Sequence, residues 1–393
     1  MESVIKMKVL VIGGMGLIGG AITEAAVKKG YSVFVLSRRK LSKKFVNLGV
    51  KGISGNWLNE KFANKIVADD YDIIVDTLVF DEKRLIKSLA IVNGHCRQYI
   101  YISTDSVYPH PADNVSENDP ININNVCWDY GINKLKAEKY LYNYGENYNF
   151  EWTCVRPTIT FGDTRIPVGY ASKRNSYTLV DRIIKGKPIV RFDNMNTRHA
   201  VCHTSIFGEA VVGLFLNKKA YKQSYHISDN NAYTYDEIFN AIEKILGIKG
   251  IYVNVSVNKV KKYSKSLYEE MIYDKNPNFV LNNEKIKVAV PKVNYHVDIE
   301  QVMKSTLENL KHTNVIDDEY NYLTDNLIIE QLNDIEDEKK RQQIEIYVKT
   351  LSNNYTRELL YYRRKKILSN FLEPLRKFKR LCKQMIVHII GAD

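Results

Sequence analysis

The sequence predicts an α/β protein built on a doubly wound parallel sheet, with a smaller α/β lobe and a helical C-terminal extension. Three observations support this fold class. Short apolar, β-branched segments alternate with helical patterns over residues 1–160. A glycine-rich turn joins the first of these strands to the first helix. The chain of 393 residues, 45% of them hydrophobic and 26% charged, is long enough for two or three structural units.

The glycine-rich turn lies between an apolar strand at 9–12 and an apolar-periodic run that starts at Leu17. Its glycines at 13, 16 and 19 permit a sharp turn, close approach of backbone N–H groups to a pyrophosphate, and close packing of the helix on the sheet. A phosphate bound there lies at the positive end of the helix dipole. The pattern predicts dinucleotide binding, and the alternative is a turn that binds nothing.

The other strands of the sheet follow in chain order. They are expected at 31–36, 49–54, 72–76, 98–103 and 151–156, with helices at 81–93 and 125–144. Right-handed crossovers between these strands predict helices on both faces of the sheet.

The end of the second strand indicates which dinucleotide is bound. The run Ser37, Arg38, Arg39 contains no carboxylate to bind a ribose 2′-hydroxyl, whereas an arginine accommodates a 2′-phosphate. This favours NADP over NAD, and the alternative is that these residues form a solvated turn.

Beyond Pro157 the pattern changes to that of a smaller lobe. We expect a loop at 158–176, helices at 177–186, 204–217 and 234–247, and single strands at 188–192, 224–227 and 251–255. The expected domains are therefore a dinucleotide-binding domain at 1–160, to which parts of 177–230 return, a substrate-binding lobe at 161–315 and a charged helical extension at 316–393.

Tyr130 and Lys134 form a Tyr-x-x-x-Lys pair in the helix expected at 125–144. A spacing of four puts both side chains on one face of a helix. An ammonium group near a phenol lowers the pKa of the phenol, so Tyr130 is predicted to act as a general acid or base. Thr104 follows the strand at 98–103, at the edge where doubly wound sheets bind ligands, and is predicted to hydrogen-bond a substrate oxygen.

Several motifs together resemble the extended short-chain dehydrogenase/reductases, in the NAD-dependent epimerase/dehydratase group that acts on nucleotide sugars. The motifs that carry the resemblance are GGMGLIGG (13–20), STDSVYP (103–109), YGINKLKAEKYL (130–141) and RPTITFG (156–162). Weaker similarity covers 198–215 and 225–242, so the resemblance extends over about 7–310. It implies a Rossmann fold, NADP or NAD as cofactor, a nucleotide-sugar substrate and a homodimer.

The resemblance also implies a catalytic triad of Thr104, Tyr130 and Lys134. Tyr130 would take a proton from a sugar hydroxyl while hydride passes to the nicotinamide, Lys134 would hold the nicotinamide ribose, and Thr104 would position the reacting oxygen. The implied cofactor contacts are Gly13, Met15, Gly16, Leu17, Ile18, Gly19, Ser37, Arg38, Asn56, Trp57, Thr77, Leu78, Tyr130, Lys134 and Pro157. The implied substrate contacts are Thr104, Tyr108, Tyr130 and Arg198, the last on the substrate diphosphate.

The chain departs from the family pattern directly after Thr104. Family members that dehydrate nucleotide sugars have Thr-Asp-Glu there, with the aspartate as acid and the glutamate as base, whereas this chain has Asp105 and Ser106. Because serine does not replace a carboxylate base, epimerisation or 4-keto reduction is favoured. One alternative is a dehydratase that uses Asp105 as acid with a base from elsewhere in the chain. Another is a nucleic-acid-binding member of the fold, of which chloroplast stem-loop-binding proteins are examples, although the intact triad argues against it.

No metal site is predicted. His199 and His203 have no carboxylate cluster nearby and are interpreted as packed or pocket-lining residues, while Arg165 and Arg174 are further candidates for phosphate contacts. The five cysteines are scattered and form no CxxC pair, which argues against a zinc site or a disulfide framework.

The net charge of +12 suits an anionic partner. Within the extension, 317–345 is acidic and the chain from Arg357 onward is basic, with apolar residues at helical steps of three and four. Such a basic amphipathic helix binds anionic membrane surfaces, and the alternative is a pair of oppositely charged helices packed together. Because no signal peptide or long apolar run is present, we expect a cytoplasmic protein, and the C-terminal helix is its candidate for membrane contact.

Overall fold

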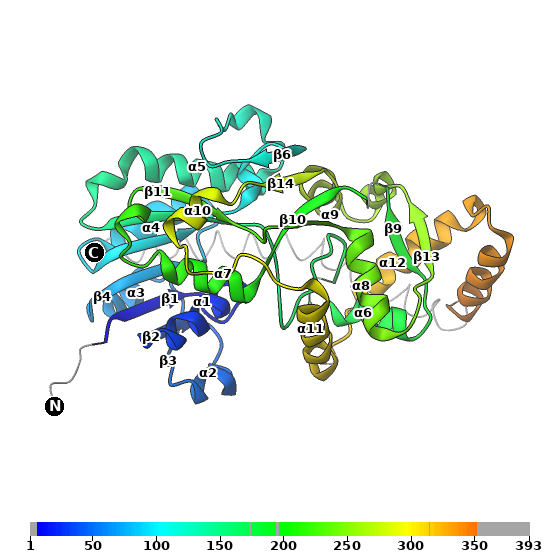
Figure 1. Cartoon of the computed structure of the whole chain (residues 1–393), viewed down its shortest axis with the longest axis horizontal. Helices are drawn as coiled ribbons and strands as arrows, with labels where there is room; N and C mark the ends of the chain where they lie inside the picture. Colours follow the sequence, from blue (N-terminus) through cyan, green and yellow to red (C-terminus); the bar gives the residue numbers. More distant parts are fainter. Residues whose placement is uncertain (1–5, 173, 194–195, 314, 352–393) are drawn as a thin grey trace, which may run out of the picture. The chain divides into compact units, whose positions relative to one another are not determined.

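Seven parallel strands form the main sheet (Figure 1). The computed structural model describes residues 6–172, 174–193, 196–313 and 315–351. The strand order is β11-β7-β5-β4-β1-β2-β3. The strands are β1 (Lys8–Ile12), β2 (Ser32–Ser37), β3 (Lys51–Ser54), β4 (Tyr71–Asp76), β5 (Cys96–Ile102), β7 (Glu151–Pro157) and β11 (Gln223–Ile227). The predicted doubly wound parallel sheet is confirmed.

The sheet grows in two directions from its first strand. From β1 the chain adds β2 and β3 on one side, and then β4, β5, β7 and β11 on the other. In doubly wound proteins this reversal creates a crevice at the carboxyl ends of the two strands that flank it. Here those strands are β1 and β4, and the glycine-rich turn follows the first of them.

Successive side chains of the central strands face two different helical layers. Val9 and Val11 pack with α1 and α7, whereas Leu10 and Ile12 pack with α3, α4 and α5. The helices are α1 (Leu17–Lys28), α3 (Glu60–Val67), α4 (Glu82–Val92), α5 (Asp129–Tyr144) and α7 (Thr204–Gly213). Because both faces of the strands are buried, their sequences are almost wholly apolar, which made them predictable.

The helix that carries Tyr130 begins later than predicted. Residues 123–125 form a separate 3₁₀ turn, in which the Asn122 side chain accepts a hydrogen bond from the backbone of Asn124, and α5 starts only at Asp129. The local hydrogen bond of the asparagine competes with a helical start at 125.

A second, mixed sheet takes β6 from the first 160 residues and its other strands from the later part of the chain, and most of these strands were not predicted. Its order is β12-β10-β14-β6, and β8 pairs with β10, so the segment expected to be a loop at 158–176 contains a strand. A separate pair joins β9 to β13. These strands are β6 (Ala112–Val115), β8 (Ile159–Phe161), β9 (Ile189–Phe192), β10 (Arg198–His203), β12 (Ala232–Thr234), β13 (Tyr252–Val255) and β14 (Phe279–Leu281).

Several helices follow in the later part of the chain (Figure 1). The predicted helices at 177–186 and 234–247 are present as α6 (Tyr177–Ile184) and α8 (Tyr235–Leu246). The second of these has a capping box, in which Thr234 and Glu237 satisfy each other's backbone N–H groups. Other helices of the described residues are α2 (Lys43–Asn47), α9 (Lys265–Glu270), α10 (Glu284–Ala289), α11 (Ile299–Thr313) and α12 (Asp318–Gln331).

The chain divides into two compact units, Met1–Leu327 and Ile328–Asp393, and both sheets belong to the first. The backbone is helical again at 338–351, which overlaps the end of the acidic stretch at 317–345. The predicted basic amphipathic helix lies at 352–393, outside the described residues. Among the described residues, no helix has the length and apolar character needed to cross a membrane. The predicted domain boundaries at 160 and 315 stay predictions.

Candidate active site

The glycine-rich turn places no capping side chain on the backbone N–H groups of the first turn of α1. Gly13 has a φ of +81° and its N–H donates to the Leu36 carbonyl at 2.9 Å, which directs the chain sharply off β1. Gly16 is the N-cap residue of α1 and, having no side chain, satisfies none of the N–H groups of the first turn. A Cβ at Gly19 would lie 2.5 Å from the Gly13 carbonyl oxygen, so only glycine fits there. The turn therefore has the features of an anion-binding helix start.

Residues after β4 lie directly beside this turn. The Thr77 hydroxyl donates to the Ile12 carbonyl at 2.8 Å, and the Leu78 N–H donates to the Asp76 carboxylate at 2.8 Å. A Cβ on Gly13 would lie 2.2 Å from Thr77 Oγ1. The structure thus brings the predicted cofactor residues Gly13, Thr77 and Leu78 together at the point where the strand order reverses.

The ends of β2 and β3 hold four more predicted cofactor residues in different environments. Arg38 and Asn56 are exposed, and Ser37 accepts a hydrogen bond from the Arg39 N–H at 3.0 Å. Trp57 is only 4% exposed, and its indole N–H donates to Ser88 at 3.0 Å. The Trp57 side chain is therefore part of the core beneath this edge.

The three predicted triad residues converge at the carboxyl end of β5. Thr104 caps the 3₁₀ turn η1 (Asp105–Val107), and its hydroxyl is close enough to Tyr130 to lower the pKa of the phenol. Lys134 is 2% exposed, and its ammonium donates to the carbonyls of Val79 at 2.5 Å and Ile102 at 2.8 Å. The same ammonium lies 5.9 Å from the ring centroid of Tyr130. Lys134 thus ties α5 to the ends of β4 and β5.

The expectation that Lys134 lowers the pKa of Tyr130 is wrong for this arrangement. Burial raises the pKa of Tyr130 to about 12, although the Thr104 hydroxyl opposes this effect. Burial also lowers the pKa of Lys134 to about 8. The ammonium is held by two carbonyl oxygens rather than by the phenol, so Tyr130 is a neutral phenol at neutral pH.

A buried carboxylate cluster adjoins Thr104, and half of it was missed by the sequence prediction. Burial and the nearby Asp274 carboxylate raise the pKa of Asp105 to about 7. Ser106 Oγ donates to Asp274 Oδ1 at 2.7 Å, and Lys275 Nζ lies 2.5 Å from Asp274 Oδ2 as an ion pair. Asp274 and Lys275 occupy a π-helical turn, η6 (Met271–Lys275), in a stretch without any motif, so no signal pointed to them.

Tyr108, predicted to contact substrate, belongs to a buried polar network instead. Its hydroxyl accepts a hydrogen bond from Arg156 at 2.7 Å and contacts His226 Nδ1 at 3.1 Å. Arg156 pairs with Glu138 at 2.6 Å, and both side chains are at most 4% exposed. Because Glu138 lies on α5 and Arg156 on β7, this ion pair fixes the helix that carries Tyr130 against the sheet.

The remaining predicted residues lie farther along the chain. Pro157 is buried as the last residue of β7, where it pairs in register with Ile227. Arg198 has an exposed side chain whose guanidinium donates to the Ala232 carbonyl at 2.6 Å. Arg165 and Arg174 are both exposed.

The two histidines of this region have structural partners. His199 is buried and stacked on Tyr235 with ring centroids 4.3 Å apart, and burial lowers its pKa to about 3. His203 accepts a hydrogen bond from the Ser205 N–H at the start of α7. Within the described part of the chain, no group of three or more His, Cys, Asp or Glu residues is arranged to hold a metal ion.

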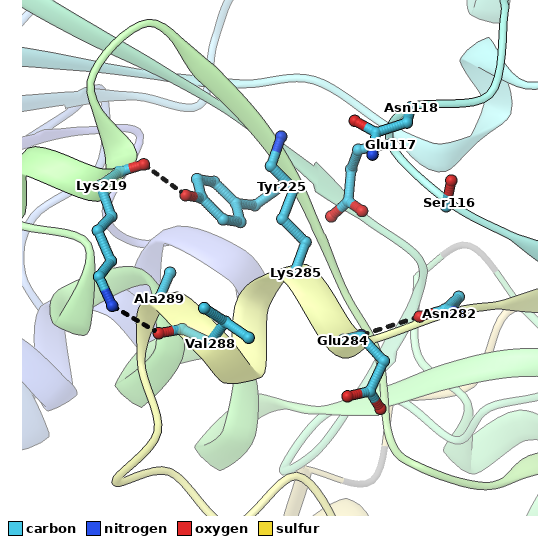
Figure 2. A pocket seen from close by; sticks show the side chains of 10 residues that line it. All are labelled: Ser116, Glu117, Asn118, Lys219, Tyr225, Asn282, Glu284, Lys285, Val288 and Ala289. Atoms are coloured by element: carbon cyan, nitrogen blue, oxygen red, sulfur yellow. Dashed lines mark hydrogen bonds between the residues drawn. The ribbon is translucent and has the colours of Figure 1, made fainter.

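None of the predicted site residues lines a pocket of about 480 Å³ (Figure 2). It is lined by Ser116, Glu117, Asn118, Lys219, Tyr225, Asn282, Glu284, Lys285, Val288 and Ala289. Its buried Glu117 accepts a hydrogen bond from the His226 N–H at 2.9 Å, so the pocket adjoins the network around Tyr108. A second pocket, of about 310 Å³, includes Met15, Gly16 and Leu17 of the glycine-rich turn.

Two curated proteins are similar to parts of the chain. Eugenol synthase 2 of Clarkia breweri is 34% identical over 97 residues, which make up 21% of this chain and 31% of that protein. The chloroplast stem-loop binding protein of 41 kDa b of Arabidopsis thaliana is 24% identical over 262 residues, which make up 61% of this chain and 63% of that protein. In both cases the chain spans less than two thirds of the relative's length.

Solved structures share the fold. That of UDP-glucuronic acid 4-epimerase from Bacillus cereus, in complex with UDP-glucuronic acid and NAD, has a TM-score of 0.63 and 18% sequence identity. It covers 78% of this chain and 100% of that chain. At this identity the likeness shows the fold, and it agrees with the predicted resemblance to nucleotide-sugar epimerases and dehydratases.

The family comparison extends over most of the described chain. The NmrA-like family matches residues 5–322, which include both sheets, the glycine-rich turn and all of the predicted site residues. The parallel sheet and the open helix start agree with this match, and the chain belongs to the NmrA-like family.

Proposed function

We propose that this chain is an NAD(P)-dependent enzyme that acts on a nucleotide-activated sugar, by epimerisation or by reduction of a 4-keto group. The observation that carries the proposal is the convergence of Thr104, Tyr130 and the Lys134 helix at the carboxyl end of β5, beside the open start of α1. Doubly wound sheets bind their ligands at this edge. The solved epimerase of the same fold, which binds NAD and UDP-glucuronic acid, supports the same class of ligand.

The residues present fit a dinucleotide. Gly13, Gly16 and Gly19 leave room for a pyrophosphate against the bare N–H groups of α1, and the exposed Arg38 suits a ribose 2′-phosphate. We therefore propose NADP or NAD as the cofactor, with NADP favoured. When bound, the nicotinamide supplies the hydride chemistry.

The protein's own residues would position and move the proton. Tyr130 would exchange a proton with the reacting sugar oxygen, and Thr104 would hold both that oxygen and the phenol. Lys134 would keep α5 in place and present its ammonium to the ribose side of the site. The exposed guanidinium of Arg198 would bind the substrate diphosphate.

The deciding variant is Tyr130→Phe, which removes one hydroxyl from a residue that is neutral at neutral pH. We expect turnover of the sugar nucleotide to fall by about 100-fold or more, because general acid–base catalysis contributes at least that much, while nucleotide affinity stays unchanged. Tyr140→Phe, on the same helix but bonded to Tyr148, is the matched control and should retain full activity. Unchanged turnover in Tyr130→Phe would rule the proposal out.

The nucleotide held by the purified protein separates the two reaction types. Denaturation and assay of the released nucleotide should yield tightly bound NAD or NADP if the hydride returns to the same sugar, as in an epimerase. A protein that is empty as purified and binds NADPH reversibly would be a reductase. A homodimer is proposed with either activity.

A dehydratase remains the second candidate, and the buried carboxylates favour it. Asp105 has a raised pKa suited to an acid, and Asp274 is a carboxylate from a distant segment of the kind that this alternative requires. Formation of a 4-keto-6-deoxy sugar nucleotide would establish it.

A nucleic-acid-binding function is a third candidate, favoured by the similarity to the chloroplast stem-loop binding protein and by the net charge of +12. Electrostatic binding of RNA weakens steeply as salt is raised. Salt-dependent retention of a stem-loop RNA, together with no turnover of any sugar nucleotide, would favour this function over the enzyme.

A further inference from the structure

Asp274 reaches the end of β5 from a distant part of the sequence. Its contact with Ser106, at 2.7 Å between Oγ and Oδ1, joins residues that are 168 positions apart. Asp274 is 5% exposed and lies on the π-helical turn η6. π-Helical turns are rare in proteins, but many of those that occur lie at functional sites.

Three hydrogen bonds, from α8 and from the loop between β9 and β10, hold this turn in place. The Tyr235 hydroxyl of α8 donates to the Lys275 carbonyl at 2.7 Å. Thr197 donates to the Asn276 carbonyl at 2.7 Å, and the Asn276 amide donates to the Asp193 carbonyl at 3.2 Å. The position of Asp274 therefore does not depend on its hydrogen bond with Ser106.

Hydroxyl groups lie in order between Tyr130 and two carboxylates. The Thr104 hydroxyl is close enough to Tyr130 to lower the pKa of the phenol, and its Oγ1 lies 3.1 Å from Ser106 Oγ and 3.4 Å from Asp105 Oδ1. Ser106 in turn donates to Asp274. Since a hydroxyl both donates and accepts, each group on the path is able to receive one proton and release another.

The buried cluster of Asp105, Asp274 and Lys275 has an excess negative charge unless it binds a proton. Two buried carboxylates, Asp105 and Asp274, face one ammonium, that of Lys275. His110 Nε2 lies 4.0 Å from Asp274, and burial lowers the pKa of His110. The other titratable groups that act on the cluster are Tyr130, His199, Tyr235 and Glu270. Like charges in a buried site favour the uptake of one proton by the pair.

The pKa directions agree with this count. Burial and Asp274 raise the pKa of Asp105 to about 7. Burial also acts to raise the pKa of Asp274, but Lys275, His110 and Ser106 outweigh it and hold the pKa below its usual range. The shared proton therefore resides mainly on Asp105.

We propose that Asp105 and Asp274 are a shared proton store for Tyr130, connected to it through the hydroxyls of Thr104 and Ser106. The role rests on the proposed function. When a 4-keto sugar is reduced, the proton held by the pair passes from Asp105, or from Asp274 through Ser106, to Thr104. The Thr104 proton passes to Tyr130, and the phenol proton passes to the sugar oxygen. The nicotinamide, when bound, would supply the hydride for the carbonyl carbon. Each hydroxyl ends with one proton and the pair ends ionised, and oxidation of a sugar alcohol returns the proton to the pair.

The carboxyl titration tests the store without any turnover. In the full chain labelled with ¹³C at aspartate carboxyls, with signals assigned through Asp105→Asn, we expect the Asp105 carboxyl to titrate near pH 7. Asp274→Asn should lower this midpoint by about one pH unit or more, because it removes a like charge, and Lys275→Met should raise it. Asp236→Asn, which removes a more exposed carboxylate paired with Arg191, is the matched control and should leave the midpoint unchanged.

The proposed proton store is ruled out if the Asp105 carboxyl of the wild type titrates near the ordinary pKa of aspartate. It is also overturned if Asp274→Asn, folded as judged by its NMR spectrum, leaves the midpoint where it was.

Ser106→Ala tests the path, because it breaks the link to Asp274 without changing any charge. We expect a several-fold lower kcat with an unchanged KM and a shifted pH profile of kcat, and Ser106→Thr should restore all three. A loss of thermal stability with an unchanged pH profile of kcat would overturn the path.

The outcomes distinguish this inference from the function on which it rests. Coupled carboxyl titration in a protein that turns over no sugar nucleotide supports the store and overturns the proposed function. Turnover with two independently titrating carboxyls at ordinary values overturns the store alone.

Discussion

At the scale of single residues, Tyr130 and Lys134 share a helix but not a hydrogen-bond partner. The four-residue spacing correctly indicates that both side chains leave α5 in the same direction. The spacing does not indicate that the Lys134 ammonium donates to the carbonyls of Val79 and Ile102, because these residues are far from Lys134 in the sequence. The proton chemistry of Tyr130 therefore depends on Thr104 and on the carboxylates beyond it.

Asp105 should make the stability of the protein depend on pH. Its pKa in the folded state, about 7, lies above the ordinary value of 3.8, so the folded protein binds a proton that the unfolded chain releases between these two values. The stabilisation is fully present below about pH 4 and is lost as the pH rises through about 7. Each pH unit between the two values corresponds to about 1.4 kcal/mol.

The measurement is the midpoint of urea unfolding from pH 4 to pH 8 for the wild type and for Asp105→Asn. Because asparagine stays neutral, the variant should gain stability relative to the wild type as the pH rises, by up to a few kcal/mol. Asp236→Asn serves as the control and should track the wild type. If the urea midpoints of Asp105→Asn and the wild type change in parallel with pH, Asp105 is ionised in the folded protein over the whole range from pH 4 to pH 8.

At the scale of elements, the glycine-rich turn and α1 were the most predictable part of the molecule. Each glycine was assigned a steric role, and the contacts at Gly13 and Gly19 agree with those roles. A Cβ at Gly19 meets backbone atoms, which cannot move aside as a side chain can.

Gly19→Ala should therefore displace the turn and weaken nucleotide binding by about tenfold or more, a loss of about 1.4 kcal/mol. Gly20→Ala, one residue further along the helix, is the control, because its nearest neighbour would be the Phe45 ring at 3.5 Å. This control should keep its affinity and gain about 0.5–1 kcal/mol of stability, since alanine is the better helix former. Isothermal titration with NADP and NAD measures both variants, and equal affinities would contradict the steric argument.

The elements of the second sheet could not be predicted in the same way. β8, β12 and β14 are three residues long, and β10 begins with charged and polar residues, so none has the apolar run of a buried central strand. Their pairing partners decide their structure: β8 is a strand because β10 lies beside it. Asp274 escaped prediction for the same reason, since only the folded chain brings it to Ser106.

At the scale of the whole molecule, a bound dinucleotide should stabilise the first compact unit. Its predicted contacts come from the ends of β1, β2, β3, β4 and β7 and from α5, so binding links elements that are far apart in sequence. A ligand that binds only the folded state at 100 times its Kd adds about 2.7 kcal/mol to stability.

Thermal unfolding should show this effect as a rise in Tm with NADP or NAD, larger for NADP if Arg38 binds the 2′-phosphate. Arg38→Ala should remove the difference between the two cofactors, while Arg97→Ala, an exposed arginine paired with Asp72, should leave it unchanged. A Tm that responds to neither cofactor would contradict dinucleotide binding.

The contact between Ser106 and Asp274 also bears on how the molecule folds. Closing a loop of 168 residues is entropically costly, and chains dominated by such distant contacts fold slowly. The main sheet from β1 to β7 is built from the first 157 residues, so it is able to collapse before the π-helical turn arrives. The complete carboxylate cluster is then among the last features to form during folding, and a chain arrested midway would already have its glycine-rich turn but would lack Asp274 at the end of β5.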